Sequence, residues 1–228
     1  MIHIARAMED DMSMAMPQMM AWSWIDWWSM FLMWTAMMIA MMVPSATPTI
    51  LIYAKVNQNR RQNSLAYVST SVFLFGYLLA WTAFSMVATI GNWLIHTQGF
   101  LTGMMGASTS NILGAALLIA AGIYQWTPFK YACLNHCRTP LGFIMTEWKE
   151  GKLGAITMGV KHGSYCVACC WLLMALLFVL GVMNLLWISL LAGFVLLEKL
   201  LPQGLWVSKI SGLGFVAWGL ILILVNYT

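Results

Sequence analysis

The fold is decided by residues 162–197, which read HGSYCVACCWLLMALLFVLGVMNLLWISLLAGFVLL. This stretch contains no Asp, Glu, Lys or Arg, and it is long enough for two segments of about 20 apolar residues, the length with which a helix crosses a bilayer. A second stretch without such residues lies between Arg61 and Lys130 and can hold two more. The sequence therefore predicts an all-α, polytopic membrane helix bundle whose partner is the lipid bilayer.

The composition agrees with this class. The chain is 61% hydrophobic and 8% charged, whereas a soluble domain carries about 25% charged residues. Its net charge of +4 comes from residues assigned to membrane loops, which predicts no nucleic-acid partner. There is no phosphate-binding Gly-rich loop and no Ser-His-Asp arrangement, so we expect neither an ATP-driven pump nor a hydrolase. This favours a protein that is not an enzyme.

Hydrophobic length predicts about six transmembrane helices, of which the fifth is short. The first contains Pro44 and Pro48, which neighbouring helices can tolerate in a membrane. The expected ranges are 28–53, 66–94, 111–126, 154–180, 184–198 and 205–225.

Loop charge predicts the orientation. Lys and Arg occur in alternate loops, and the loops 91–110 and 181–183 contain none. Because positive residues favour the cytoplasmic side, both termini are predicted to be extracytoplasmic, in the cell (inner) membrane. The basic residues used here are Lys55, Arg60, Arg61, Lys130, Arg138, Lys149, Lys152, Lys199 and Lys209.

We therefore divide the chain into two parts. Residues 1–27 form a Met-rich extracytoplasmic leader with an interfacial aromatic segment, and residues 28–228 form the transmembrane bundle. Within the bundle, residues 127–152 are expected to be a cytoplasmic loop that carries Cys and His, too small to have a core of its own.

The strongest candidate site is in the fourth predicted helix. His162, Cys166, Cys169 and Cys170 recur at spacings of three and four, so they share one stripe of a helix. Thiolates with an imidazole are ligands for Cu(I) or Zn(II). The alternative is that these cysteines only fill space as small apolar residues. Lys161 is a candidate counter-ion, because buried thiolates need a compensating charge.

A second candidate site is in the loop. Cys133 and Cys137 are four residues apart with His136 between them. If this segment is helical, the two sulfurs share a face; if it is a loop, His136 can join them. It either completes a site with the fourth helix, forms a separate site, or is an ordinary polar loop whose thiols stay reduced. Glu198 and Lys199 are interpreted as an interfacial pair.

Methionine points to the metal. The leader contains Met12, Met14 and Met16 in an alternating run, and methionines also recur at helical spacing in the first predicted helix. Thioethers bind Cu(I) and reject hard ions, so this distribution favours copper, with zinc as the alternative. Met is also an adaptable apolar filler, and packing is the competing interpretation of the helical methionines.

Several segments resemble the DUF2182 family, whose members are described as predicted metal-binding integral membrane proteins. They are Ala36–Pro44, Gly122–Lys130 with Cys133 and Cys137, 162–171, and 181–184. The resemblance extends roughly from Trp28 to Lys199. It implies a metal-binding membrane bundle without a settled activity. On the matching motifs, it implies as ligands Cys133, Cys137, His162, Cys166, Cys169 and Cys170.

Three functional hypotheses follow from these observations. The leading one is copper handling: uptake or storage of Cu(I), or its delivery to a partner membrane enzyme. The second is an accessory or structural subunit that binds other membrane-protein subunits and holds a static metal. The third is a thiol-disulfide oxidoreductase, because Cys166 and Cys169 form a CxxC pair.

Overall fold

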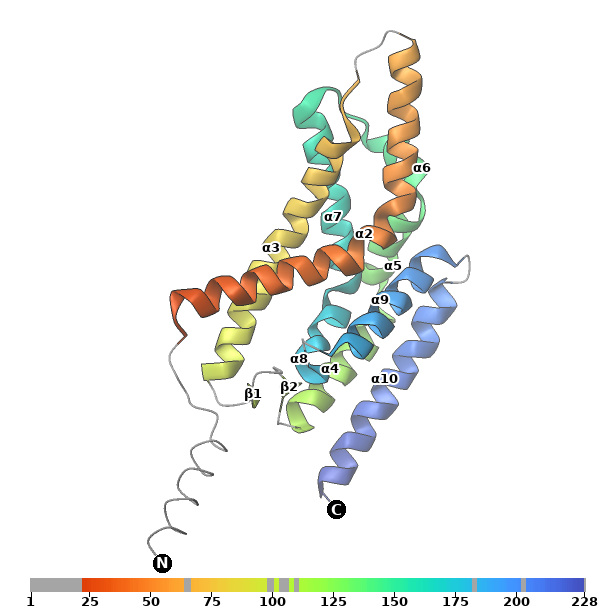
Figure 1. Cartoon of the computed structure of the whole chain (residues 1–228). Coiled ribbons are helices and arrows are strands. Elements are labelled where there is room, and N and C mark those ends of the chain that lie inside the picture. The colour runs from red at the N-terminus through yellow and green to blue at the C-terminus, as the bar shows by residue number, and fades with distance from the viewer. Residues whose placement is uncertain are drawn as a thin grey trace, which may run out of the picture.

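The protein is described here from a computed structural model, and Figure 1 shows the whole chain. The structure describes residues 22–63, 67–97, 101–102, 107–108, 111–181, 184–201 and 204–227. The leader methionines Met12, Met14 and Met16 lie outside these ranges. The elements are α2 (Trp24–Gln62), α3 (Thr70–Thr97), β1 (Leu101–Thr102), β2 (Ala107–Ser108), α4 (Asn111–Tyr124), α5 (Pro128–Arg138), α6 (Pro140–Glu147), α7 (Gly151–Ala175), α8 (Leu177–Leu180), α9 (Leu185–Leu200) and α10 (Gly204–Tyr227).

The all-α prediction is confirmed, apart from a two-residue antiparallel pairing of β1 with β2. All six predicted helices are found, as α2, α3, α4, α7 continued by α8, α9 and α10. The count of six membrane spans is not confirmed. In the described ranges, α2, α3, α7 with α8, and α10 are each long and apolar enough to cross a membrane. Helices α4 and α5 are bent by 68° relative to each other and make a fifth span only if the bent pair is counted as one. Helix α9 has 16 residues, fewer than the roughly 20 that a span needs.

The predicted loop 127–152 contains two helices, α5 and α6. Each begins with a proline, Pro128 and Pro140. Proline suits the first turn of a helix, because its missing N–H would have no partner there and its φ is already helical. The Thr127 hydroxyl also caps α5 by accepting a bond from the Lys130 N–H at 3.3 Å. These prolines start helices in a segment that was predicted to be a loop, with a helix at Cys133 and Cys137 as one of two alternatives.

Helix α2 changes direction strongly along its length (Figure 1). It begins with a capping box, in which the Ser23 N–H donates to Asp26 at 2.8 Å and the Ser23 hydroxyl accepts from the Asp26 N–H at 3.3 Å. Pro44 and Pro48 lie inside the helix. Each removes a backbone donor and displaces the preceding turn, which is the usual cause of such a bend.

Helix α7 lies in the middle of the bundle (Figure 1) and packs closely on α3. The closest approach is at Gly159, where an added Cβ would lie 2.1 Å from the Phe73 carbonyl oxygen. Gly76 of α3 faces the same point, and a Cβ added to it would lie 2.3 Å from the Ile156 carbonyl oxygen. The absence of side chains here lets the two backbones touch, and this contact fixes the face of α7 that carries its cysteines.

Helix α9 brings charge into the interior. Glu198 and Lys199 are both buried, so the predicted interfacial pair is wrong. Lys130 is also completely buried, although Lys130 and Lys199 were both treated as loop residues when the membrane orientation was predicted. The termini remain predicted to be extracytoplasmic on the basis of the other basic residues.

Candidate metal site

Four thiols from two helices meet in the bundle interior. On α7, Cys166, Cys169 and Cys170 lie on one face, and each is 1% exposed. From α5, the buried Cys137 side chain lies close to those of Cys166 and Cys169. Cys170 lies close to the same two side chains. We call Cys137, Cys166, Cys169 and Cys170 the four-thiol cluster.

The cysteines of the cluster are free, and two of their thiols are held by the helix itself. The thiols of Cys169 and Cys170 donate to the Cys166 carbonyl oxygen, at 3.1 Å and 2.9 Å. Within the ranges that the structure describes, no three His, Cys, Asp or Glu side chains already converge as ligands on one point. Binding a metal therefore requires these two side chains to rotate from the carbonyl toward Cys137 and Cys166.

A lysine from α9 is the counter-charge of the cluster. Lys199 Nζ lies 2.8 Å from Cys166 Sγ and 3.2 Å from Ser45 Oγ. The Lys161 side chain instead donates to Glu147 at 2.6 Å and is 41% exposed, so the predicted counter-ion is wrong. The bond from Lys161 holds the pKa of the Glu147 carboxyl below its usual value.

Two further helices complete the walls. The Tyr77 hydroxyl of α3 lies 3.2 Å from Cys166 Sγ and donates to the Met42 carbonyl oxygen of α2 at 3.1 Å. That carbonyl belongs to the turn that Pro44 and Pro48 loosen. Cys166 therefore meets an ammonium, a phenol and a neighbouring thiol, which makes it the centre of the cluster.

His162 lies one helical turn before Cys166 and is 2% exposed. Its ring packs among three aromatic rings, with centroids 5.1 Å away for Phe143, 5.8 Å for Tyr77 and 6.2 Å for Phe73. Among the residues that the structure describes, its Nδ1 has no hydrogen-bond partner. A buried imidazole nitrogen without a partner is costly, so His162 has a donor atom available to a metal.

The three candidate ligands of α5 point in different directions. Cys133 and Cys137 are both buried, as expected for two residues four apart on a helix. His136 is exposed; its ring stacks on Tyr165 with centroids 4.4 Å apart, and its Nδ1 lies 2.8 Å from the Ala132 carbonyl oxygen. The structure thus brings Cys137 to the α7 thiols, keeps Cys133 one turn away, and directs His136 to Tyr165.

The methionines of α2 belong to the same core. Met37, Met38, Met41 and Met42 are buried, in one hydrophobic cluster with the four thiols. Thioethers in this position fill space, as apolar side chains do, and also offer soft sulfur close to the thiols.

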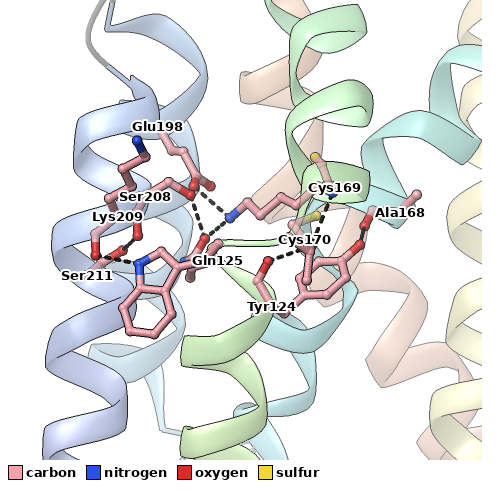
Figure 2. Close-up of polar contacts among 12 residues, drawn as sticks. Tyr124, Gln125, Ala168, Cys169, Cys170, Glu198, Ser208, Lys209 and Ser211 are labelled. Carbon is pink, nitrogen blue, oxygen red and sulfur yellow. Dashed lines mark hydrogen bonds and ion pairs between the residues drawn. The ribbon is translucent and has the colours of Figure 1, made fainter.

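A second buried polar group adjoins the site. Lys130 Nζ forms an ion pair with Glu198 at 2.6 Å, with both side chains at most 1% exposed, and also donates to Gln125. The Ser208 hydroxyl of α10 donates to the same Gln125 oxygen at 2.7 Å. Figure 2 shows Glu198, Gln125 and Ser208 converging, with Cys169 and Cys170 nearby. Adjacent residues of α9 therefore serve different partners: Glu198 neutralises Lys130, and Lys199 faces the thiols.

The comparison with protein families points to copper. The model of the PpoB2 family, described as a copper chaperone, matches residues 31–222. The chain belongs to the PpoB2 copper chaperone family. The match includes every cysteine and starts after the leader methionines. It supports in part the metal-binding membrane family that the sequence motifs resemble, under a name other than DUF2182. No match was found among curated proteins or among solved structures.

Sequence reasoning missed Lys199, Tyr77 and Ser45 as parts of the site. A signal was available for Lys199: consecutive residues of a helix point in different directions, so Glu198 and Lys199 cannot pair with each other as they stand. Spacing along α3 does not connect Tyr77 with a residue of α7. Nothing in the sequence pairs Ser45 with a residue of α9.

Proposed function

We propose that the protein binds Cu(I) at the four-thiol cluster, inside the membrane, and passes it to a partner. The observation that carries this proposal is the meeting of Cys137 of α5 with three cysteines of α7 in a dry interior. Thiolates are soft ligands that favour Cu(I). The family description supports copper as the cargo.

Charge supports the same metal. Two thiolates with one Cu(I) carry one net negative charge, and an isolated charge in a low-dielectric interior costs several kcal/mol. The Lys199 ammonium, 2.8 Å from Cys166 Sγ, supplies the missing positive charge. The loaded site is then neutral with two thiolates, and the other two cysteines are free to take over the ion during transfer.

The methionines supply weaker ligands on the way. Met38, Met41 and Met42 lie in the core that contains the thiols, and the predicted extracytoplasmic leader offers Met12, Met14 and Met16. Neutral thioethers hold Cu(I) less tightly than thiolates do. We infer a gradient from the leader to the cluster, and the chaperone description favours delivery to a partner membrane enzyme over uptake.

The other two hypotheses make different use of the same thiols. Four thiols also suit a structural Zn(II), which would make the protein an accessory subunit with a static metal. Thiol-disulfide exchange needs an accessible thiolate, and the cluster is at most 9% exposed, so burial favours metal binding over exchange with another protein.

The test is metal analysis of the full-length protein purified in detergent under reducing conditions without chelator. We expect about one copper per chain, and a loss of that copper when Cys166, Cys169 and Cys170 are changed to Ser. Ser164→Ala, on the exposed side of α7, is the control and should keep its copper. Zinc in the native protein would support the accessory-subunit hypothesis, and metal that survives the triple change would contradict the proposal.

A further inference from the structure

Aromatic rings gather where the start of α2 meets the end of α3. Trp22 lies with its ring centroid 5.7 Å from that of His96 and 6.1 Å from that of Trp27. The Trp27 ring lies 6.4 Å from that of Trp93. Indole faces attract cations within about 6 Å. This end of the bundle is the one that loop charge predicts to be extracytoplasmic.

A thioether points into the same junction. Asn92 of α3 is 2% exposed, and its side-chain amide donates to Met30 Sδ of α2 at 3.2 Å. The bond fixes the Met30 sulfur toward α3. A methionine that only filled space in lipid would need no such donor.

Helical spacing places the imidazole of His96 one turn of α3 beyond Asn92, the partner of this sulfur. His96 follows Asn92 by four residues, so both lie on one face of α3, and Asn92 is bonded to Met30. Met30 in turn follows Trp27 by three residues on α2. The Met30 thioether and the His96 ring are therefore linked through Asn92, which bonds to one and lies one turn of α3 from the other, beside the indole rings. Thioether and imidazole are ligands for Cu(I), and a thioether rejects hard ions.

The face continues inward toward the thiols. Ser85 and Thr89 lie on the same face of α3 as Asn92 and are completely buried. Their hydroxyls donate to carbonyl oxygens of their own helix, at 2.9 Å and 2.8 Å. Deeper in the bundle, α2 presents Met38 and Met42 to the core that contains the four-thiol cluster.

We propose that Met30 and His96 form a second site for a soft monovalent cation, Cu(I), at the outer end of the α2–α3 interface. This rests on the proposed function, since the site would receive the ion before the cluster does. With one thioether and one neutral imidazole, it binds more weakly than the thiolates and releases the ion inward.

The experiment follows the histidine nitrogens directly. The chain contains four histidines, so selective ¹⁵N-histidine labelling of the full-length protein in nanodiscs gives few signals. The signal of His96 is assigned as the one lost in His96→Gln. Ag(I), which mimics Cu(I) without redox chemistry, is titrated into a variant in which the four cysteines of the cluster are serines. We expect the His96 signal to move, and Met30→Leu to weaken this response about tenfold or more.

Met86→Leu is the matched control, because Met86 is on α3 and 42% exposed; its response should equal that of the unchanged protein. If the serine variant does not fold, the same signal is followed in the native protein after the cluster has been filled. A His96 signal that ignores Ag(I), or equal responses for Met30→Leu and Met86→Leu, would overturn the proposal. Failure of the proposed thiol site would be seen in a different measurement: the copper content would not depend on the cysteines. The His96 signal does not report this.

Discussion

At the scale of single residues, the charge at Cys166 matters most. Lys199 reaches it from α9 and is bonded to Cys166 Sγ and Ser45 Oγ. Two unit charges about 5 Å apart interact by about 3 kcal/mol at an effective dielectric constant of about 20. If the thiols bind Cu(I) as proposed, the ammonium therefore contributes substantially to holding the thiolates and their metal in the interior.

Replacing Lys199 with Met should weaken Cu(I) binding by about a hundredfold, which corresponds to that 3 kcal/mol. Met preserves the length and apolar stem of the side chain and removes only the charge. The measurement is competition with a coloured Cu(I) chelator in detergent. Lys209→Met is the control, since Lys209 is exposed and lies over the Trp206 ring. Equal affinities for the two variants would show that Lys199 does not compensate the site.

Residue chemistry was readable from the sequence where it depended on spacing along one helix. Cys166, Cys169 and Cys170 were placed on one face by counting, and the structure agrees. The pairing of Lys199 with Cys166, or of Glu198 with Lys130, depends on how separate helices turn toward each other. Spacing within a helix carries no such information, which is why Lys161 was selected as counter-ion.

At the scale of elements, two contacts position the site. Gly159 and Gly76 allow α7 to touch α3, which places Tyr77 against Cys166. The buried pair of Lys130 and Glu198 joins α5 to α9, so the helix that carries Cys137 is tied to the helix that carries Lys199.

Gly159→Ala should push α3 and α7 apart. Its new Cβ would lie 2.1 Å from a backbone oxygen, and overpacking of this kind costs about 1–3 kcal/mol. We expect a lower midpoint of thermal unfolding in detergent, together with weaker copper binding because Tyr77 leaves Cys166. Gly193→Ala is the matched control, since nothing lies within 4 Å of that Cβ position. A stability of Gly159→Ala equal to that of the control would contradict the close approach.

Glu198→Gln should destabilise the protein by about 3–5 kcal/mol, because it leaves the Lys130 ammonium buried without its partner. The double change Lys130→Met with Glu198→Leu removes both charges and should recover most of this loss. Thermal unfolding of the three proteins in one detergent measures both effects. A double variant as unstable as Glu198→Gln would show that the ion pair is not what joins α5 to α9.

Element positions were largely predictable, because apolar length decides where a membrane helix can form. The segment 127–152 was predicted to be a loop, with a helix at Cys133 and Cys137 left open; the signal for its two helices is that Pro128 and Pro140 each occupy a first turn. The close contact of α7 with α3 was not predictable, because the partner of Gly76 depends on the tertiary arrangement.

At the scale of the whole molecule, the bundle arranges sulfur ligands along its length. Met30 lies at the end of the α2–α3 interface that is predicted to be extracytoplasmic, methionines of α2 occupy the core, and the four thiols lie beside them. The ligands change from neutral thioethers to compensated thiolates. Such an order favours movement of Cu(I) toward the cluster.

The orientation is testable with fusions. Positive loop charge predicts an extracytoplasmic C-terminus, so alkaline phosphatase fused after Thr228 should be active, and green fluorescent protein at the same place should be dark. A fusion after Asn63, next to Arg60 and Arg61, should show the opposite behaviour. The reverse pattern would place the site with Met30 and His96 on the cytoplasmic side.

The most direct test of the account is X-ray absorption at the copper edge of the full-length protein loaded with one Cu(I). We predict coordination by sulfur alone, at low coordination number, and loss of this signature in Cys137→Ser with Cys166→Ser, which removes a thiol from each of α5 and α7. The Ser164→Ala protein should give the native spectrum. Oxygen or nitrogen ligands without sulfur, or a spectrum unchanged by the double cysteine variant, would contradict the claim that these two helices jointly hold the metal.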